Sequence, residues 1–170
     1  ITGLTAGEQG AKKFLAFIDA AGATVEMDEN NNQLAVSYDV VRMPDVTIPT
    51  VTLVPSPPSR GGTFSATVSV KNTGSGVATG VYVSVWADAL VPQTNWTTQT
   101  TGTTIGDIGT NRTVSWTFTD LPAGTGTLAR TFRAFADSKF LLAEVDESNN
   151  HATVSYTPAS RPDFVIWDIQ

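Results

Sequence analysis

The chain has no cysteine and only one histidine among its 170 residues. Without cysteine there is no disulfide, no thiol nucleophile and no thiolate metal site. His151 alone offers little to a catalytic triad or a histidine-rich metal site, and we interpret it as a polar residue at the start of a strand. These absences remove several common forms of enzyme chemistry.

Charge is also scarce, since only 15% of the residues are Asp, Glu, Lys or Arg and the net charge is -6. Lys and Arg do not cluster anywhere, so we expect no nucleic acid partner. No apolar run approaches 18 residues, so we expect no membrane span. The abundance of Thr, Gly and Asn, together with the acidic balance, favours an extracellular location, either at a cell surface or secreted.

A repeat is present instead, because residue 132 onward resembles residue 14 onward without a gap, an offset of 118 residues. The residues that recur identically at this offset include Phe14, Phe17, Asp19, Glu26, Asp28, Glu29, Asn31, Asn32, Val36, Ser37, Tyr38, Pro44 and Asp45. We therefore expect three parts: residues 1–43 as the C-terminal part of one repeat, residues 44–158 as a complete repeat, and residues 159–170 as the linker and first strand of a third.

Within residues 44–158 apolar and polar residues alternate, which is typical of half-buried strands. In "TFSATVSVKN" we expect Phe64, Ala66, Val68 and Val70 to face inward, and Val81, Val83 and Val85, then Val114, Trp116 and Phe118, to do so in two later strands. Turn-forming segments rich in Gly, Pro, Asn and Ser separate the strands. The pattern predicts an all-β fold, an antiparallel immunoglobulin-like sandwich of about seven strands with partial repeats at both ends.

The segments "PDVTI", "GGTFSATVSVKNTGSGVATGVYVSVWAD", "LPAG" and "VDESNNHATVSY" resemble the CARDB family, the cell-adhesion-related domain of bacterial and archaeal surface proteins. The resemblance covers the whole central repeat. It implies an immunoglobulin-like sandwich, usually in tandem, on secreted or envelope-anchored proteins. It implies no enzymatic activity.

The acidic segment before the last strand is a candidate metal site. In a sandwich this loop lies at the same end as the first residues of its own domain. Hard oxygen donors gathered there are the ligands that calcium prefers. The candidate ligands are Asp45, Asp137, Glu144, Asp146, Glu147 and Asn149. The alternative is that the Asn residues build a tight turn and the acids are solvated.

Two tryptophans and two asparagines are further candidates. Trp86 and Trp96 could stack on a glycan, or else serve as core residues or cover a loop. Asn95 and Asn111 begin the triplets "NWT" and "NRT", which are potential glycosylation sites in loops.

Three functions follow from these observations, none of them enzymatic. The first is a structural or adhesion module of an extracellular tandem-repeat surface protein or filament, whose partners are neighbouring repeats. The second is a module that binds a cell-surface glycan or protein through Trp- and Thr-rich loops. The third is a filament subunit that adds strands to identical subunits. Calcium is the one cofactor that we expect.

Overall fold

The computed structural model describes residues 7–160, which divide into two compact units on either side of the Arg42–Met43 bond. All the elements within the described residues are strands, and every paired strand is antiparallel. The predicted all-β class is therefore correct. Each unit is described on its own below.

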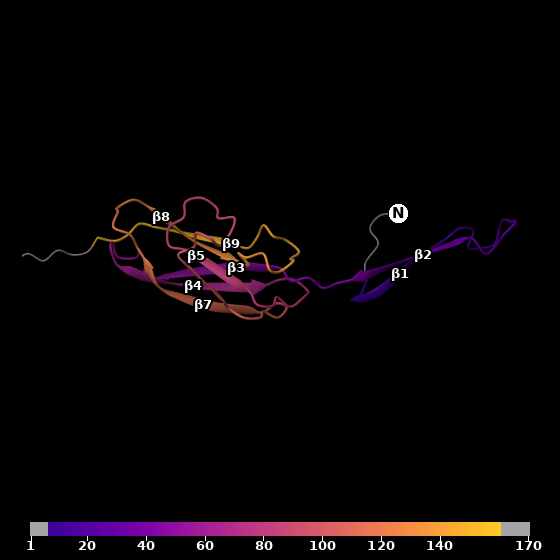
Figure 1. Cartoon of the computed structure of the whole chain (residues 1–170), viewed down its shortest axis with the longest axis horizontal. Coiled ribbons are helices and arrows are strands. Elements are labelled where there is room, and N and C mark those ends of the chain that lie inside the picture. The colour runs from indigo at the N-terminus through magenta and orange to yellow at the C-terminus, as the bar shows by residue number, and fades with distance from the viewer. Residues whose placement is uncertain (1–6, 161–170) are drawn as a thin grey trace, which may run out of the picture. The chain divides into compact units, whose positions relative to one another are not determined.

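The first unit is a β-hairpin of β1 (Gly10–Phe17) and β2 (Gln33–Val40) (Figure 1). Phe14 pairs with Val36 across the hairpin, and Lys12 pairs with Tyr38. Its large apolar side chains are exposed: Phe14 by 39%, Val36 by 51% and Tyr38 by 41%. The hairpin thus has an alternating strand sequence but no second layer within the described residues to bury it.

The second unit contains seven strands in two sheets (Figure 1). One sheet has the order β3-β4-β7 and the other the order β6-β5-β8-β9. The strands are β3 (Val46–Val54), β4 (Thr63–Asn72), β5 (Tyr82–Trp86), β6 (Thr101–Thr104), β7 (Thr113–Pro122), β8 (Arg130–Ala136) and β9 (His151–Tyr156). This is the antiparallel sandwich of about seven strands that the sequence predicts.

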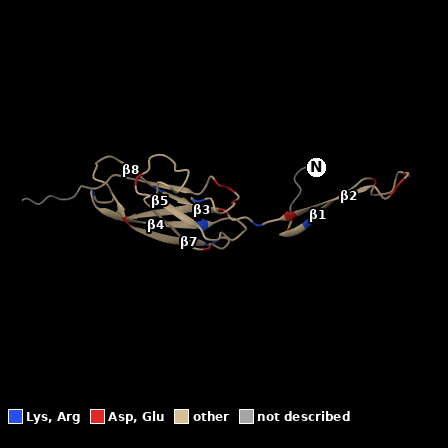
Figure 2. Cartoon of the chain, viewed as in Figure 1, with Lys and Arg blue, Asp and Glu red and all other residues tan. Residues whose placement is uncertain are grey.

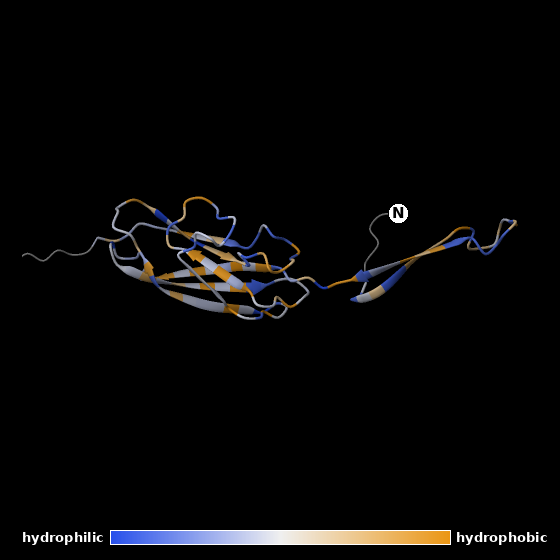
Figure 3. Cartoon of the chain, viewed as in Figure 1, coloured by the Kyte–Doolittle hydropathy of each residue, from blue (hydrophilic) through white to orange (hydrophobic). Residues whose placement is uncertain are grey.

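The two sheets enclose one apolar core, to which alternate residues of each strand contribute. In this core the ring centroid of Phe64 lies 6.2 Å from that of Phe132 and 5.4 Å from that of Tyr156. The predicted inward residues of β4 and of the strand after it are all buried: Phe64, Ala66, Val68, Val70, Val81, Val83 and Val85. Figure 3 shows the alternation as apolar bands along the strands.

Two features differ from the pattern read in the sequence. Strand β6 lies in a Thr-rich stretch that has no apolar alternation, so the sequence indicates a loop there. Trp116 pairs with the buried Val68, yet it is 45% exposed because β7 is an edge strand of its sheet. Trp116 thus lies on the predicted inward face of β7 but is only partly covered, whereas Phe118 on the same strand is buried.

A second, smaller apolar cluster lies on the other face of the four-stranded sheet. It consists of Trp86, Ala89 and Phe135. Ala89 belongs to the loop after β5, and its N–H donates to the carbonyl of Thr131 on β8 (2.8 Å). Phe140, from the loop after β8, meets Phe135 edge to face. Loops therefore cover the face of this sheet that points away from the main core.

Candidate functional site

The acidic loop, residues 137–150, joins β8 to β9 and begins with a tight turn at Asp137. Asp137 has a φ of 49°, in the left-handed region that Asp tolerates better than most residues. Its carboxylate accepts hydrogen bonds from the N–H groups of Leu141 (3.1 Å) and Leu142 (3.0 Å). Both carboxylate oxygens are thus used to hold the turn.

The middle of the acidic loop is held in the same way. Glu147 Oε1 accepts the N–H of Glu144 (3.0 Å). Asp146 Oδ1 accepts both the N–H (2.8 Å) and the hydroxyl (2.6 Å) of Ser148. The bond from the Ser148 N–H to Asp146 is the local pattern of an Asx-type turn. Figure 2 shows the run of acidic residues in this loop.

The acidic loop also fixes the start of the domain's first strand. The N–H of Val46 donates to Glu144 Oε2 (3.1 Å), and Asn149 Nδ2 donates to Asp45 Oδ1 (2.8 Å). The N–H of Val145 donates to the carbonyl of Pro44 (3.0 Å). Segments about 100 residues apart in the sequence are thereby held together through side-chain carboxylates.

The first unit builds the same loop from the earlier copy of the sequence. Asp19, with a φ of 46°, accepts the N–H groups of Ala23 (2.9 Å) and Thr24 (2.8 Å). Glu29 accepts the N–H of Glu26 (2.9 Å). Each bond has its counterpart 118 residues later, as does the pairing of Phe14 with Val36. The repeated acidic sequence therefore encodes a repeated loop structure.

Burial changes the ionisation of two of these carboxyl groups. The pKa of Glu144 is raised to about 7, chiefly because the side chain is withdrawn from water, and the bonds from Val46 and Asn150 only partly offset this. Burial also raises the pKa of Asp137. The bonds from Ser148 instead lower the pKa of Asp146. Glu144 is thus a carboxyl group of the acidic loop whose pKa lies near neutral pH.

The donor geometry for a metal is incomplete. No three Asp, Glu or His side chains converge at metal-binding distance within residues 7–160. Three acceptor oxygens are nevertheless buried without a hydrogen-bond partner: Glu144 Oε1, Asn149 Oδ1 and Asn150 Oδ1. Such oxygens are ones that a cation or a water molecule would satisfy. The loop does contain turns, but acids rather than the Asn side chains accept its backbone N–H groups, and Asp137 and Glu144 are buried rather than solvated. The metal site stays a prediction.

The two candidate tryptophans lie in different environments. Trp86 is only 4% exposed, and its indole N–H donates to Thr98 Oγ1 (3.2 Å). The prediction that Trp86 serves as an exposed stacking platform was therefore wrong, because loops cover its face of the sheet. Trp96 is 42% exposed. Lys139 Nζ lies 4.9 Å from the Trp96 ring centroid and 3.7 Å from that of Tyr82.

The two glycosylation candidates are both on the surface of the second unit. Asn95 is exposed in the loop between β5 and β6, where its Oδ1 accepts hydrogen bonds from the N–H (3.0 Å) and the hydroxyl (2.6 Å) of Thr97. Asn111 is exposed in the turn before β7, with a φ of 58°. Both side chains are accessible, and whether they are modified stays a prediction.

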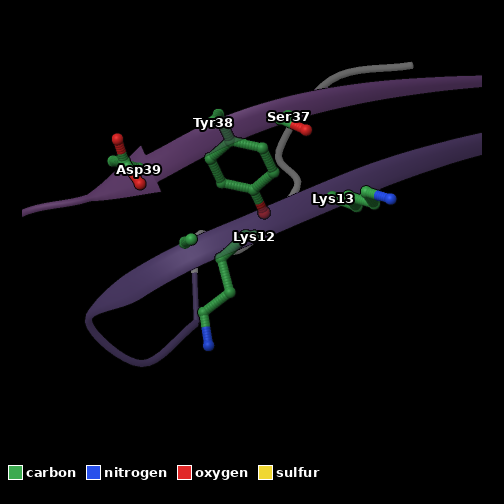
Figure 4. A pocket seen from close by; sticks show the side chains of 6 residues that line it. Lys12, Lys13, Ser37, Tyr38 and Asp39 are labelled. Atoms are coloured by element: carbon green, nitrogen blue, oxygen red, sulfur yellow. The ribbon is translucent and has the colours of Figure 1, made fainter.

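A hollow lies along the hairpin of the first unit, between Lys12 on β1 and Tyr38 on β2 (Figure 4). The residue equivalent to Tyr38 is Tyr156, which in the second unit is 6% exposed and donates to the carbonyl of Ala87 (2.9 Å). Phe64 packs against the Tyr156 ring. The hollow beside Tyr38 therefore corresponds to a position that core residues fill in the second unit. We interpret it as an uncovered core position rather than as a ligand pocket.

Two buried polar residues of the second unit were missed in the sequence analysis. Asn72, at the end of β4, is fully buried and makes four hydrogen bonds to the backbone. Arg133, in the middle of β8, is buried beneath the covering loops. The alternation of β4 and β8 predicts the face of each residue, but no local signal indicates what covers that face.

A search of the described residues for a membrane-spanning helix finds none of sufficient length and apolar character.

Comparison with known proteins agrees with this architecture. The CARDB family model matches residues 43–154. The CARDB domain of a Pyrococcus furiosus protein, crystallised in complex with di-metal ions, is 22% identical with a TM-score of 0.54, and the match covers 72% of this chain and 99% of that one. A domain of a "putative cell surface protein" of Methanosarcina acetivorans is 20% identical with a TM-score of 0.53, covering 69% of this chain and 93% of that one. No curated protein sequence matches the chain significantly. The family match runs from the first residue of the second unit to residue 154, near the end of β9. The chain therefore belongs to the CARDB family.

Proposed function

We propose that this chain is a structural module of an extracellular surface protein in which CARDB units follow one another in tandem. The observation that carries the proposal is the shared loop and strand register of the two units, offset by 118 residues. A module of this kind acts mechanically, by spacing or presenting another element. The relationship to a Methanosarcina acetivorans surface protein supports an extracellular setting. The proposal includes no catalytic activity.

Further support comes from the side chains that the hairpin exposes. Phe14, Val36 and Tyr38 are exposed, whereas their equivalents Phe132, Val154 and Tyr156 pack in the main core of the second unit. The hairpin is therefore built as the last two strands of a sandwich. We infer that residues 1–43 are the end of a preceding repeat, whose other strands would cover this apolar face.

The solution mass of the chain tests the proposal against its filament alternative. A tandem module gives a mass near the 18.0 kDa monomer by light scattering at micromolar concentration. A mass that grows with concentration, and that returns to the monomer when residues 1–42 are removed, would instead identify a subunit that assembles through the hairpin. The shortened chain is the control, because it retains all seven strands of the sandwich.

Glycan or protein binding is a second candidate, and it rests on Trp96. Its half-exposed indole lies beside Lys139 and near Tyr82, a group of side chains suited to stacking on a sugar ring. A glycan array probed with the chain and with Trp96→Ala tests this. Signals that disappear in the variant support binding, and signals unchanged by the substitution count against it.

Calcium is a candidate ligand of the acidic loop. The unpartnered oxygens of Glu144, Asn149 and Asn150 support this, because a cation would satisfy them. A cation at these atoms would draw Glu144 into its ionised form. The expected result is that calcium raises the melting temperature more at pH 8 than at pH 5.5, and that Glu144→Gln abolishes the increase. Glu26→Gln, the equivalent change in the first unit, is the control. A melting temperature unaffected by calcium and by excess chelator would remove the candidate.

A further inference from the structure

Arg133 is a cation placed beneath the loops of the second unit. It lies in the middle of β8, between the core residues Phe132 and Ala134, and so points to the opposite, loop-covered face of the sheet. Its strand neighbours are Trp86 on β5 and Thr153 on β9. The residue is only 8% exposed. A charged side chain is thus held in a mostly covered position.

No counter-charge accompanies this guanidinium. The ion pairs found in the described residues join Arg42 to Glu8 and Arg130 to Asp88, and neither involves Arg133. Its Nε is buried with no hydrogen-bond acceptor. A mostly covered Arg normally has an acidic partner, because withdrawing even part of its charge from water is unfavourable. Arg133 has none in residues 7–160.

The groups around Arg133 are hydrogen-bond donors. His151 and Thr153 alternate on the same face of β9, and Thr153 is exposed beside Arg133. His151 has a buried Nδ1 without a partner, and burial together with the Arg133 charge lowers its pKa. A guanidinium, an imidazole and a hydroxyl with no carboxylate form a set that suits an anion.

These residues are not part of the repeated framework. At the offset of 118 residues, Arg133 corresponds to Leu15, His151 to Gln33 and Thr153 to Ala35. By contrast, the acids of the loop before β9 recur in the first unit, where they build the same turns. The equivalent hairpin of the first unit therefore forms with Leu15 in this place, and of the two units only the second carries the cation.

We propose that Arg133 is the centre of an oxyanion-binding site on the loop-covered face of β8, with Thr153 and His151 as flanking donors. The ligand is a carboxylate, sulfate or phosphate group, whose paired oxygens match the fork of a guanidinium. It is either a small free anion or the anionic group of a polysaccharide. The site does not depend on the tandem function proposed above.

The direct test measures the Arg133 Nε–H resonance and the melting temperature of the chain in sodium chloride, sodium sulfate and sodium acetate at equal ionic strength. In the wild type we expect sulfate or acetate to shift the Arg133 Nε–H resonance, and to raise the melting temperature by a few degrees over chloride. Arg133→Met keeps the apolar stem and removes the charge, so it should lose the anion response and melt higher than the wild type in chloride. Arg112→Gln, an exposed arginine of the same unit, should respond like the wild type.

Two comparisons complete the test. An oligosaccharide of uronic acids that binds at least tenfold more tightly than acetate identifies a polysaccharide as the source of the anion, whereas equal affinities identify a small free anion. The same anion response in Arg133→Met would overturn the proposal. A second pair of results would also overturn it: Arg133→Met melts at a lower temperature than the wild type in chloride, and no anion changes the melting temperature of the wild type. Arg133 would then contribute to packing alone.

Discussion

Glu144 accepts a hydrogen bond from the backbone N–H of Val46, which lies 98 residues earlier and is the first residue of β3. The same oxygen accepts a second bond from Asn150, at the end of the acidic loop. One buried carboxyl group thus ties the start of the domain to the connection between its last two strands. This role is mechanical, and it explains why an acidic residue is placed where burial disfavours its charge.

The first prediction concerns the pH dependence of stability. Because the folded state raises the pKa of Glu144 to about 7, from an ordinary value of 4.5, folding favours the protonated form. This stability is complete below pH 4.5 and is lost as the pH rises through 7. Between pH 6.5 and 8.5 we expect the Glu144 carboxyl group to contribute a loss on the order of 1 kcal/mol.

Chemical denaturation at several pH values measures this loss. Glu144→Gln, which cannot ionise, should flatten the profile over the same range. Glu26→Gln is the matched control from the first unit, and it should leave the slope unchanged. A wild-type stability that stays constant or increases from pH 6.5 to 8.5 would contradict the assignment.

The sequence predicts the layers of this fold better than its surface. In β4 and β5 apolar and polar residues alternate, so the apolar residues of both strands that face the main core can be identified without coordinates. Strand β6 consists of Thr and Gly only, and an edge strand of this kind carries no apolar signal. Pairing with β5 rather than local composition makes it a strand.

The candidate sites show the same limit. The repeat locates the acidic loop and the fold places it near Asp45. Only coordinates show that Asp137, Asp146 and Glu147 accept hydrogen bonds from the backbone of their own loop. Trp86 and Arg133 both alternate outward, as an exposed residue would. They are buried because loops cover that face, and coverage by a loop leaves no periodic pattern in the sequence.

The second prediction uses the repeat as its own control. Phe132→Ala removes a fully buried ring that packs against Phe64, so we expect a loss of about 3 to 5 kcal/mol. Phe14→Ala changes the equivalent residue, which is 39% exposed, and should leave the unfolding of the second unit unchanged. Denaturant titration followed by tryptophan fluorescence measures both. Equal losses in the two variants would show that the hairpin is as well packed as the sandwich.

The third prediction concerns Asn72, which is fully buried. Its Nδ2 donates to the carbonyls of Gly76 (2.7 Å) and Ile108 (2.9 Å), and its Oδ1 accepts the N–H groups of Asp45 (3.1 Å) and Gly74 (3.0 Å). Asn72→Ala leaves these buried groups unpaired, so we expect a loss of about 3 kcal/mol or more.

Asn72→Asp is the informative companion. It preserves the shape and the two accepted bonds but replaces the donors to Gly76 and Ile108 with an acceptor. Its loss should also be large, and it should shrink at low pH, where the carboxyl group is protonated. Thr73→Ala, at the exposed neighbouring position, should cost less than about 1 kcal/mol. An Asn72→Ala chain as stable as Thr73→Ala would show that the network contributes little.

The last prediction separates the two tryptophans. Trp86→Ala removes a nearly buried indole that packs with Ala89 and Phe135, and we expect it to cost about 3 to 5 kcal/mol. Trp96→Ala removes a half-exposed ring and should cost less than about 1 kcal/mol. Acrylamide should quench a smaller fraction of the fluorescence in the Trp96→Ala chain than in the Trp86→Ala chain, because the first change removes a half-exposed ring and the second a buried one. If Trp96→Ala destabilises as strongly as Trp86→Ala, then the loop after β5 depends on Trp96 for its structure, and Trp96 would no longer be available as a free surface for a glycan.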